Sequence, residues 1–146
     1  ITLMNEIGMW VDLSHTTDHT ADDMIELANE VMVSHGAIRE HTKRPRNRSI
    51  NHLKKIAAKG GIFGITPWQH LIGTDDNAYE QVIQLALDYG LNHAACIGTD
   101  LGAPIKSHET VKSIFDLAKV ADHFKEDADK IKWENAYHFF QRALPD

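Results

Sequence analysis

Two Ser-His pairs are the part of the sequence best suited to chemistry. Ser14-His15 and Ser34-His35 each stand at the end of a short apolar run. Neutral imidazole is the commonest metal ligand in proteins, and neighbouring parallel strands lie only about 4.8 Å apart. His15 and His35 could therefore converge on one zinc ion, although a catalytic zinc usually has three protein ligands. The alternative is an ordinary capping pair at each strand end, and the spacing alone leaves both interpretations open.

A carboxylate and a guanidinium extend the possible chemistry. Asp100 follows the apolar run 94–98, and at the mouth of a strand it could move a proton to or from water or a leaving amine. Its alternative interpretation is a turn or capping residue. Arg46 lies in the basic run 43–48 and could bind a substrate carboxylate through two parallel hydrogen bonds. That run is otherwise a solvated loop or a nucleic-acid patch.

Other site chemistries are disfavoured. A Ser-His-Asp triad on Ser14 or Ser34 lacks the Gly-x-Ser-x-Gly turn, and adjacent residues on a strand point to opposite faces. The single cysteine, Cys96, allows neither an internal disulfide nor a Cys-based zinc site. Seven further histidines share no spacing and are expected at the surface or in loops: His19, His52, His70, His93, His108, His123 and His138.

The elements that would hold these residues alternate along the chain. Nearly continuous apolar runs predict buried strands over 9–13, 31–34, 62–65 and 94–98, as in a parallel sheet covered on both faces. Helical patterns cover 18–29, 50–59, 76–89, 108–122 and 127–143, and the opening residues resemble the tail of a helix that ends at Gly8. Ser49 is an expected N-cap, and Gly60 and Gly90 are expected stops. In the helix 108–122, Val111, Ile114, Phe115 and Ala118 are expected to face inward.

This α/β order predicts a parallel sheet with right-handed crossovers. Two architectures fit: an open doubly wound sheet, or half of a (β/α)₈ barrel, with residues 1–146 as a single domain. The nucleotide-binding signatures of open sheets are absent from the sequence. In either architecture the functional groups project from the carboxyl ends of the strands.

Composition limits the function classes. The chain has 146 residues, 42% of them apolar, and a net charge of -6, which argues against a nucleic-acid partner. No apolar run approaches the roughly 20 residues of a transmembrane helix, and no signal peptide is visible. Because the chain opens at Ile1 without a methionine, apparently within an element, the natural N-terminus could lie upstream.

Taken in order, these motifs resemble the second half of the membrane (renal) dipeptidase family. The motifs are Gly8–Thr16, Val33–His35, Arg44-Pro45-Arg46-Asn47, Lys59–Ile65, Ile97–Asp100 and the closing segment 133–140. The resemblance implies the C-terminal half of a TIM-type barrel that hydrolyses dipeptides with two zinc ions. It also implies that His15 and His35 bind one zinc, that Arg46 binds the substrate carboxylate, and that Asp100 is the general acid/base.

The chain also departs from the family pattern. The family's His-x-Asp pair and bridging Glu would lie upstream, so the resemblance implies a partial metal site and a chain that is inactive alone. Four parallel strands cannot close a barrel, so the missing N-terminal half-barrel or a second copy is expected to cover the open edges. Asp100-Leu101-Gly102 lacks the family's second acid, and the loop 67–70 differs. The alternatives are an incompetent half-barrel fragment and a flavodoxin-like, non-enzymatic binding module.

Overall fold

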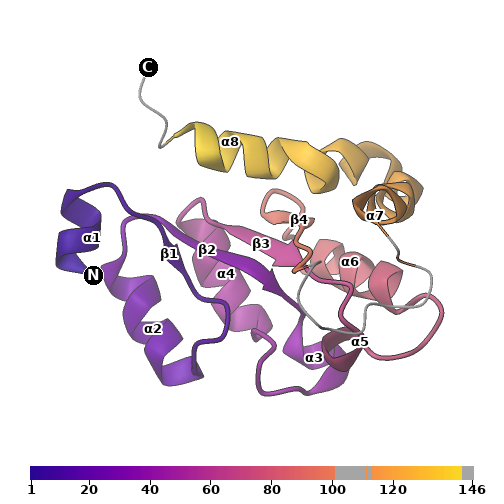
Figure 1. The fold of residues 1–146 in the computed structure, drawn as a ribbon, viewed down its shortest axis with the longest axis horizontal. Coiled ribbons are helices and arrows are strands. Elements are labelled where there is room, and N and C mark those ends of the chain that lie inside the picture. Colours follow the sequence, from indigo (N-terminus) through magenta and orange to yellow (C-terminus); the bar gives the residue numbers. More distant parts are fainter. Residues whose placement is uncertain (101–110, 112, 143–146) are drawn as a thin grey trace.

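The computed structural model describes residues 1–100, 111 and 113–142. Four strands form one parallel sheet: β1 (Val11–Asp12), β2 (Val31–Gly36), β3 (Ile62–Ile65) and β4 (Ala95–Ile97). Their spatial order, β1-β2-β3-β4, is the order of the sequence (Figure 1). A doubly wound sheet reverses its strand order at a switch point, whereas a barrel does not. The order therefore favours the half-barrel over the open sheet, and the predicted parallel α/β arrangement is confirmed.

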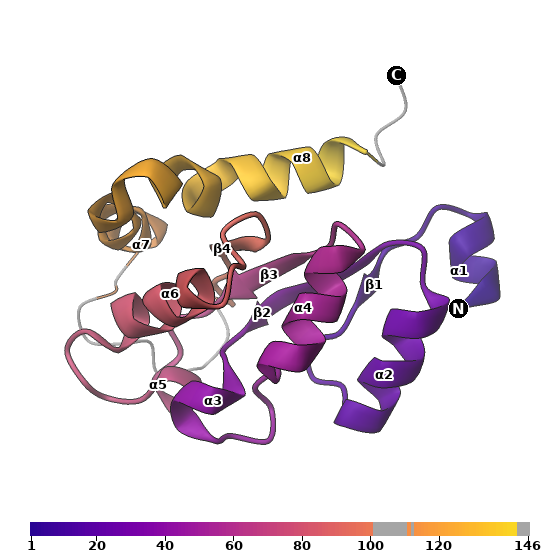
Figure 2. The same cartoon turned by 180° about the vertical axis from the view of Figure 1, so that it is seen from behind.

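Helices connect the strands and flank the sheet. The longer connections carry α2 (Asp18–Leu27), α4 (Ile50–Ala58) and α6 (Ala78–Asp88), and the chain opens with α1 (Thr2–Glu6). Two short helices, α3 (Arg39–Thr42) and α5 (Gln69–Ile72), directly follow β2 and β3. Figures 1 and 2 show α8 (Asn135–Gln141) running above the sheet and α2 below it. No helix in the described part of the chain has the length and apolar character needed to cross a membrane.

The two faces of the sheet carry different cores because strand side chains alternate. Val31, Val33 and Phe63 belong to the large cluster that also includes the buried faces of α2, α4 and α6. On the other face, Ile62 and Cys96 pack against Phe139 of α8. In a closed barrel this second face is the interior, which layers of side chains fill.

The C-terminal segment closes the amino ends of the strands. After α7 (Ile114–Ala121) it passes through a 3₁₀ segment (Asp122–Asp127) and a π-helical turn (Lys130–Glu134) into α8. Asn135 Nδ2 donates to the carbonyl oxygens of Asn92 at 2.9 Å and Ala95 at 2.8 Å. The last helix predicted over 127–143 is confirmed from Ala128 to Gln141, with a π-helical turn inside it, and residue 143 lies outside the described residues.

Several predicted boundaries shift. Ser49 caps α4 as expected, and Gly60 and Gly90 have positive φ at the helix ends. The helix predicted over 108–122 is described only from residue 114, where a Ser113–Asp116 capping box begins it; the expected residues 108–110 and 112 lie outside the described part of the chain.

Two side chains of α7 were assigned to the wrong face. The prediction that Ile114 and Phe115 face inward is wrong, because they are 51% and 73% exposed. The buried stripe of α7 is instead formed by Leu117 and Ala121, which are one helical turn apart.

Strand β2 is longer than predicted and comes very close to its neighbours. It continues to Gly36, and its pairing with β3 is irregular between Val33 and Gly36. A Cβ atom on Gly64 would lie 2.1 Å from the Ser34 carbonyl oxygen, and one on Gly98 would lie 2.3 Å from the same atom. Only glycine fits where three backbones approach this closely.

Replacing Gly64 with alanine should therefore destabilise the fold. We expect Gly64→Ala to lower the free energy of unfolding by about 2–3 kcal/mol or more, because backbone atoms must move to admit the methyl group. Urea denaturation monitored by circular dichroism would measure the change. Gly36→Ala is the matched control: its Cβ would meet the Val33 Cγ1 atom at 3.3 Å, a side chain that can shift. Equal losses in the two variants would contradict the close-approach argument.

Candidate active site

The two histidines singled out by the sequence meet at the carboxyl ends of β1 and β2. Their Nε2 atoms are 2.8 Å apart, and the rings meet edge to face with centroids 4.9 Å apart. His15 lies in the loop that follows β1, whereas His35 lies within β2 because that strand runs further than predicted. The two imidazoles thus present nitrogen atoms to the same point in space.

Unusual backbone geometry aims these side chains. Among the described residues, four non-glycine residues have positive φ, and two of them are His15 (φ 69°) and Asp100 (φ 52°). Such conformations are uncommon for L-residues and tend to gather at functional sites. The irregular pairing of β2 at Ser34 and His35 has a similar effect, because bulges redirect side chains.

Asp12 organises the histidine pair. Its Oδ1 atom accepts hydrogen bonds from the backbone N–H groups of Ser14 at 2.9 Å and Ser34 at 3.0 Å. Its Oδ2 atom accepts the Ser34 hydroxyl at 2.5 Å. Burial raises the pKa of the Asp12 carboxyl, but the hydrogen bonds from Ser34 and Ser14 outweigh it, so the pKa lies below its ordinary value. Asp12 is therefore an ionised acceptor.

This arrangement determines the tautomer of His35. Ser34 Oγ lies 2.9 Å from His35 Nδ1, and its single proton is donated to Asp12. Nδ1 of His35 must then carry a proton and donate it to Ser34. In the neutral ring, Nε2 is left with a free lone pair that points toward His15. A metal-binding histidine commonly has its other ring nitrogen held in this manner.

Arg46 and Asp100 complete the group. The Arg46 guanidinium contacts both ring nitrogens of His15 and stacks on the Trp68 ring, with its carbon 5.1 Å from the ring centroid. Asp100 Oδ2 lies 3.7 Å from His35 Nε2. Partial burial lowers the pKa of His15, and the nearby charges of Arg46 and His35 lower it further, which favours the neutral ring. The structure thus gathers all four residues selected from the sequence.

The donor set fits part of a zinc site. Two nitrogens at about 2.0–2.1 Å from one tetrahedral zinc ion would be about 3.3 Å apart, and a small rotation of either ring reaches that from 2.8 Å. The proton on His35 Nδ1 leaves the Nε2 lone pair of the neutral ring for a metal, and the lowered pKa of His15 favours its neutral form. Within residues 1–100, 111 and 113–142, no group of three or more potential ligands is found. The pair accordingly fits as two ligands of one ion and not as a complete site.

The same geometry argues against a serine nucleophile. In a Ser-His-Asp triad the histidine accepts the serine proton and the carboxylate holds the histidine. Here the carboxylate of Asp12 takes the proton of Ser34, and His35 donates to Ser34. The order of donors is reversed, so Ser34 orients an imidazole and is not activated for attack.

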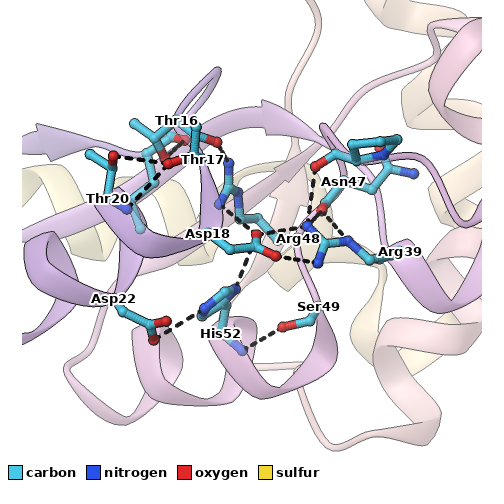
Figure 3. A network of polar contacts seen from close by, with 12 residues as sticks. Thr16, Thr17, Asp18, Thr20, Asp22, Arg39, Asn47, Arg48, Ser49 and His52 are labelled. Carbon is cyan, nitrogen blue, oxygen red and sulfur yellow. Dashed lines mark hydrogen bonds and ion pairs between the residues drawn. The ribbon is translucent and has the colours of Figure 1, made fainter.

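A second polar network, not predicted from the sequence, is centred on Asp18, Arg39 and Arg48 (Figure 3). Asp18 binds both terminal nitrogens of Arg39, at 2.5 and 2.7 Å, and lies 3.5 Å from Arg48. Arg48 is only 1% exposed and also donates to the Thr16 carbonyl oxygen. This network ties the loop after β1 to the loop after β2. The burial of Arg48 does not fit the solvated-loop interpretation of the basic run 43–48, and charge alone gives no sign of it.

His52 belongs to the same network and corrects a prediction. It was expected at the surface, but it is buried between α4 and α2, with Nε2 3.2 Å from Asp22 Oδ1. The prediction is wrong because carboxylates on α2 face α4 and partner the imidazole there. The spacing of Asp18 and Asp22, one helical turn apart, was the available signal.

The sequence is similar to those of known dipeptidases. The sequence model described as membrane dipeptidase (peptidase family M19) matches residues 1–143. Dipeptidase verJ of Clonostachys rogersoniana is 41% identical over 64 residues, which cover 43% of this chain and 16% of that protein. An uncharacterized dipeptidase of Schizosaccharomyces pombe is 28% identical over 128 residues, which cover 82% of this chain and 30% of that protein.

Solved structures agree on the fold. The crystal structure of dipeptidase AC, a metallopeptidase of family M19, superposes with a TM-score of 0.86 at 18% identity, covering 98% of this chain and 46% of that one. A metallopeptidase from Rhodobacter sphaeroides, liganded with a phosphinate mimic of the dipeptide L-Ala-D-Ala, gives 0.85 at 18% identity, covering 98% and 45%. The chain therefore has the fold of part of a TIM-type barrel, and it spans less than half the length of these relatives.

The network around Asp18 predicts a specific loss of stability. Asp18→Ala leaves the guanidinium groups of Arg39 and Arg48 without their carboxylate, and we expect a loss of about 1–3 kcal/mol. Asp23→Ala on the same helix is the control: it removes only a contact with His19, which is 91% exposed, so the loss should stay below about 0.5 kcal/mol. Thermal or urea unfolding would measure both.

The pH dependence checks the source of this stabilisation. The hydrogen bond from Arg39 lowers the pKa of Asp18 despite some burial. A lowered folded pKa stabilises the protein above the unfolded value of about 3.9 and ceases to do so as the pH falls through the folded pKa. The gap between wild type and Asp18→Ala should be constant above about pH 5 and shrink in acid. A gap that persisted unchanged at low pH would rule out the ion pair as its source.

Proposed function

Because the chain belongs to the membrane dipeptidase family, peptidase family M19, we propose that it forms the C-terminal part of a metal-dependent dipeptidase. Residues 1–146 act as one domain of that enzyme and supply His15, His35, Arg46 and Asp100 to its active site. The observation that carries the proposal is the 2.8 Å approach of two histidine Nε2 atoms at the carboxyl ends of β1 and β2. In barrel enzymes this end of the sheet holds the catalytic groups.

His15 and His35 would hold one zinc ion of a two-zinc centre. Zinc bound there would lower the pKa of a coordinated water and polarise the scissile carbonyl. The chain itself contributes orientation: Asp12 and Ser34 hold the His35 ring in the tautomer that leaves Nε2 free. Asp100, 3.7 Å from that nitrogen, is close enough to exchange a proton with the attacking water and the leaving amine.

Arg46 would bind the free carboxylate of a dipeptide. Its guanidinium lies beside His15, so a carboxylate bound there would bring the adjacent amide to the histidine pair. The Trp68 ring holds the guanidinium from one side and leaves its remaining donors available. A dipeptide mimic occupies the matched metallopeptidase of Rhodobacter sphaeroides, which supports a substrate of this size.

The remaining strands would come from an N-terminal half-barrel. Strands β1 and β4 each have one neighbour in the described sheet, and parallel edges with free backbone groups are expected to be covered. The matched structures are about twice as long as this chain, which favours an N-terminal half over a second copy. That half would provide the other ligands, so the 146-residue chain alone should have little or no activity.

Zinc analysis with dipeptide turnover tests the site. In the complete gene product, we expect His15→Ala/His35→Ala to lose zinc and to lower kcat/KM by more than about 100-fold, since disturbing groups behind a ligand already costs 10–100-fold. His19→Ala is the control, because that exposed imidazole lies outside the site. Unchanged zinc content in the double variant would rule these ligands out. Full zinc loading and dipeptide turnover by the 146-residue chain alone would contradict the proposal that this chain supplies only part of the zinc ligands.

Substitution of Asp12 tests the tautomer of His35. In Asp12→Asn, Oδ1 still accepts the two backbone N–H groups, so the amide NH₂ faces Ser34. We expect Ser34 then to donate to His35 Nδ1, which is 2.9 Å away, so that the ring proton moves to Nε2 and blocks its lone pair. We expect zinc affinity to fall about 10–100-fold, and ¹⁵N NMR of His35 to report the other neutral tautomer. The control Asp23→Asn should change neither the zinc affinity nor the His35 tautomer. An unchanged His35 tautomer in Asp12→Asn would contradict the proposed effect of Asp12, through Ser34, on the position of the ring proton.

A further inference from the structure

A cavity of about 530 Å³ opens beside Arg46, on the side of His15 that faces α2. The loops after β1 and β2 form its wall, and the lining residues are His15, Thr16, Thr17, Asp18, Arg39, Lys43, Pro45 and Arg46. The proposed function uses only the edge of this space, where Arg46 and His15 lie. Its size suits a substrate side chain next to the carboxylate that Arg46 would bind.

The charges that line the cavity are unbalanced. Among the described residues that line it, Asp18 alone carries a carboxylate, and that group is already bound to both terminal nitrogens of Arg39. Lys43 and Arg46 form no ion pair with any carboxylate in the described part of the chain. Two uncompensated positive charges therefore face the cavity. Since Asp18 is neutralised, it does not repel an incoming anion.

Lys43 also has an unusual backbone conformation. It is the C-cap of α3, with φ 51° and ψ 29°, and its N–H donates to the Arg39 carbonyl oxygen at 2.7 Å. Glycine is the usual residue for a left-handed helix end, and a side chain there costs stability. Lys43 therefore combines a strained backbone with a place in the cavity wall, and strained residues tend to gather at functional sites.

We propose that this cavity selects dipeptides whose C-terminal residue is acidic, aspartate or glutamate. Arg46 binds the main-chain carboxylate, and the Lys43 ammonium binds the side-chain carboxylate of the same residue. Pro45 and the neighbouring threonines shape the space between them. The inference rests on the proposed function, which assigns Arg46 its carboxylate, and adds to it a substrate class set by Lys43.

Charge-matched substrate pairs test this assignment in the complete gene product. The kcat/KM for Ala-Glu is compared with that for Ala-Gln, which has the same shape without the charge. We expect wild type to favour Ala-Glu by at least about fivefold, as for a hydrogen bond between two charged groups. The preference should weaken in 1 M salt, because the lysine is exposed.

Variants of Lys43 separate charge from structure. Lys43→Met should lower kcat/KM for Ala-Glu about fivefold more than for Ala-Gln, and Lys43→Arg should retain the preference. Lys43→Gly should lose the preference while raising the melting temperature, because glycine relieves the left-handed strain. Lys54→Met is the control: Lys54 contacts the Tyr89 ring away from the cavity, so the substrate ratio should stay unchanged.

The outcomes distinguish this inference from the proposed function. Hydrolysis of none of the dipeptides would overturn the proposed function and the inference together. Turnover of both substrates with equal kcat/KM would overturn only the inference, as would an acidic preference that survives in Lys43→Met. An acidic preference lost in Lys43→Gly while the protein becomes more stable would support it.

Discussion

The carboxylate of Asp12 is the constraint on which the rest of the site depends. It joins the ends of β1 and β2 by accepting two backbone N–H groups and one hydroxyl, so neither strand can shift along the other without breaking these bonds. A partly buried carboxylate is tolerated only when it is well hydrogen-bonded. The bonds that satisfy this carboxylate are the same bonds that align the two Ser-His segments and set the proton on His35.

A second buried charge extends this constraint to the surrounding loops. Arg48 is almost completely buried, and its guanidinium needs the Thr16 carbonyl oxygen and the Asp18 carboxylate nearby (Figure 3). Both partners lie at the start of α2, directly after His15. The loop that carries Arg46 is thereby held against the loop that carries His15. Hydrogen bonds and ion pairs of buried polar groups therefore fix how these two loops lie at the carboxyl ends of the strands.

Much of this arrangement could be predicted from the sequence. Apolar runs and helix caps predicted the alternating elements, and the repeated Ser-His at strand ends predicted that His15 and His35 would lie together. What the sequence could not reveal depends on long-range geometry. The burial of His52 requires that α4 lie against α2, and the inward turn of both Ser34 and His35 requires irregular pairing with β3. The exposure of Phe115 follows from where α7 begins, which no local pattern specified.

The carboxyl and amino ends of the strands differ in backbone strain and in aromatic packing. At the carboxyl ends, His15, Lys43 and Asp100 hold positive φ angles that cost free energy. At the amino ends, Trp10 lies against the Phe139 and Phe140 rings of α8, with centroids 5.6 and 4.8 Å away. Aromatic packing of this kind stabilises a fold without constraining the far end of the strands. The aromatic contacts of α8 and the strained backbone conformations thus lie at opposite ends of the strands.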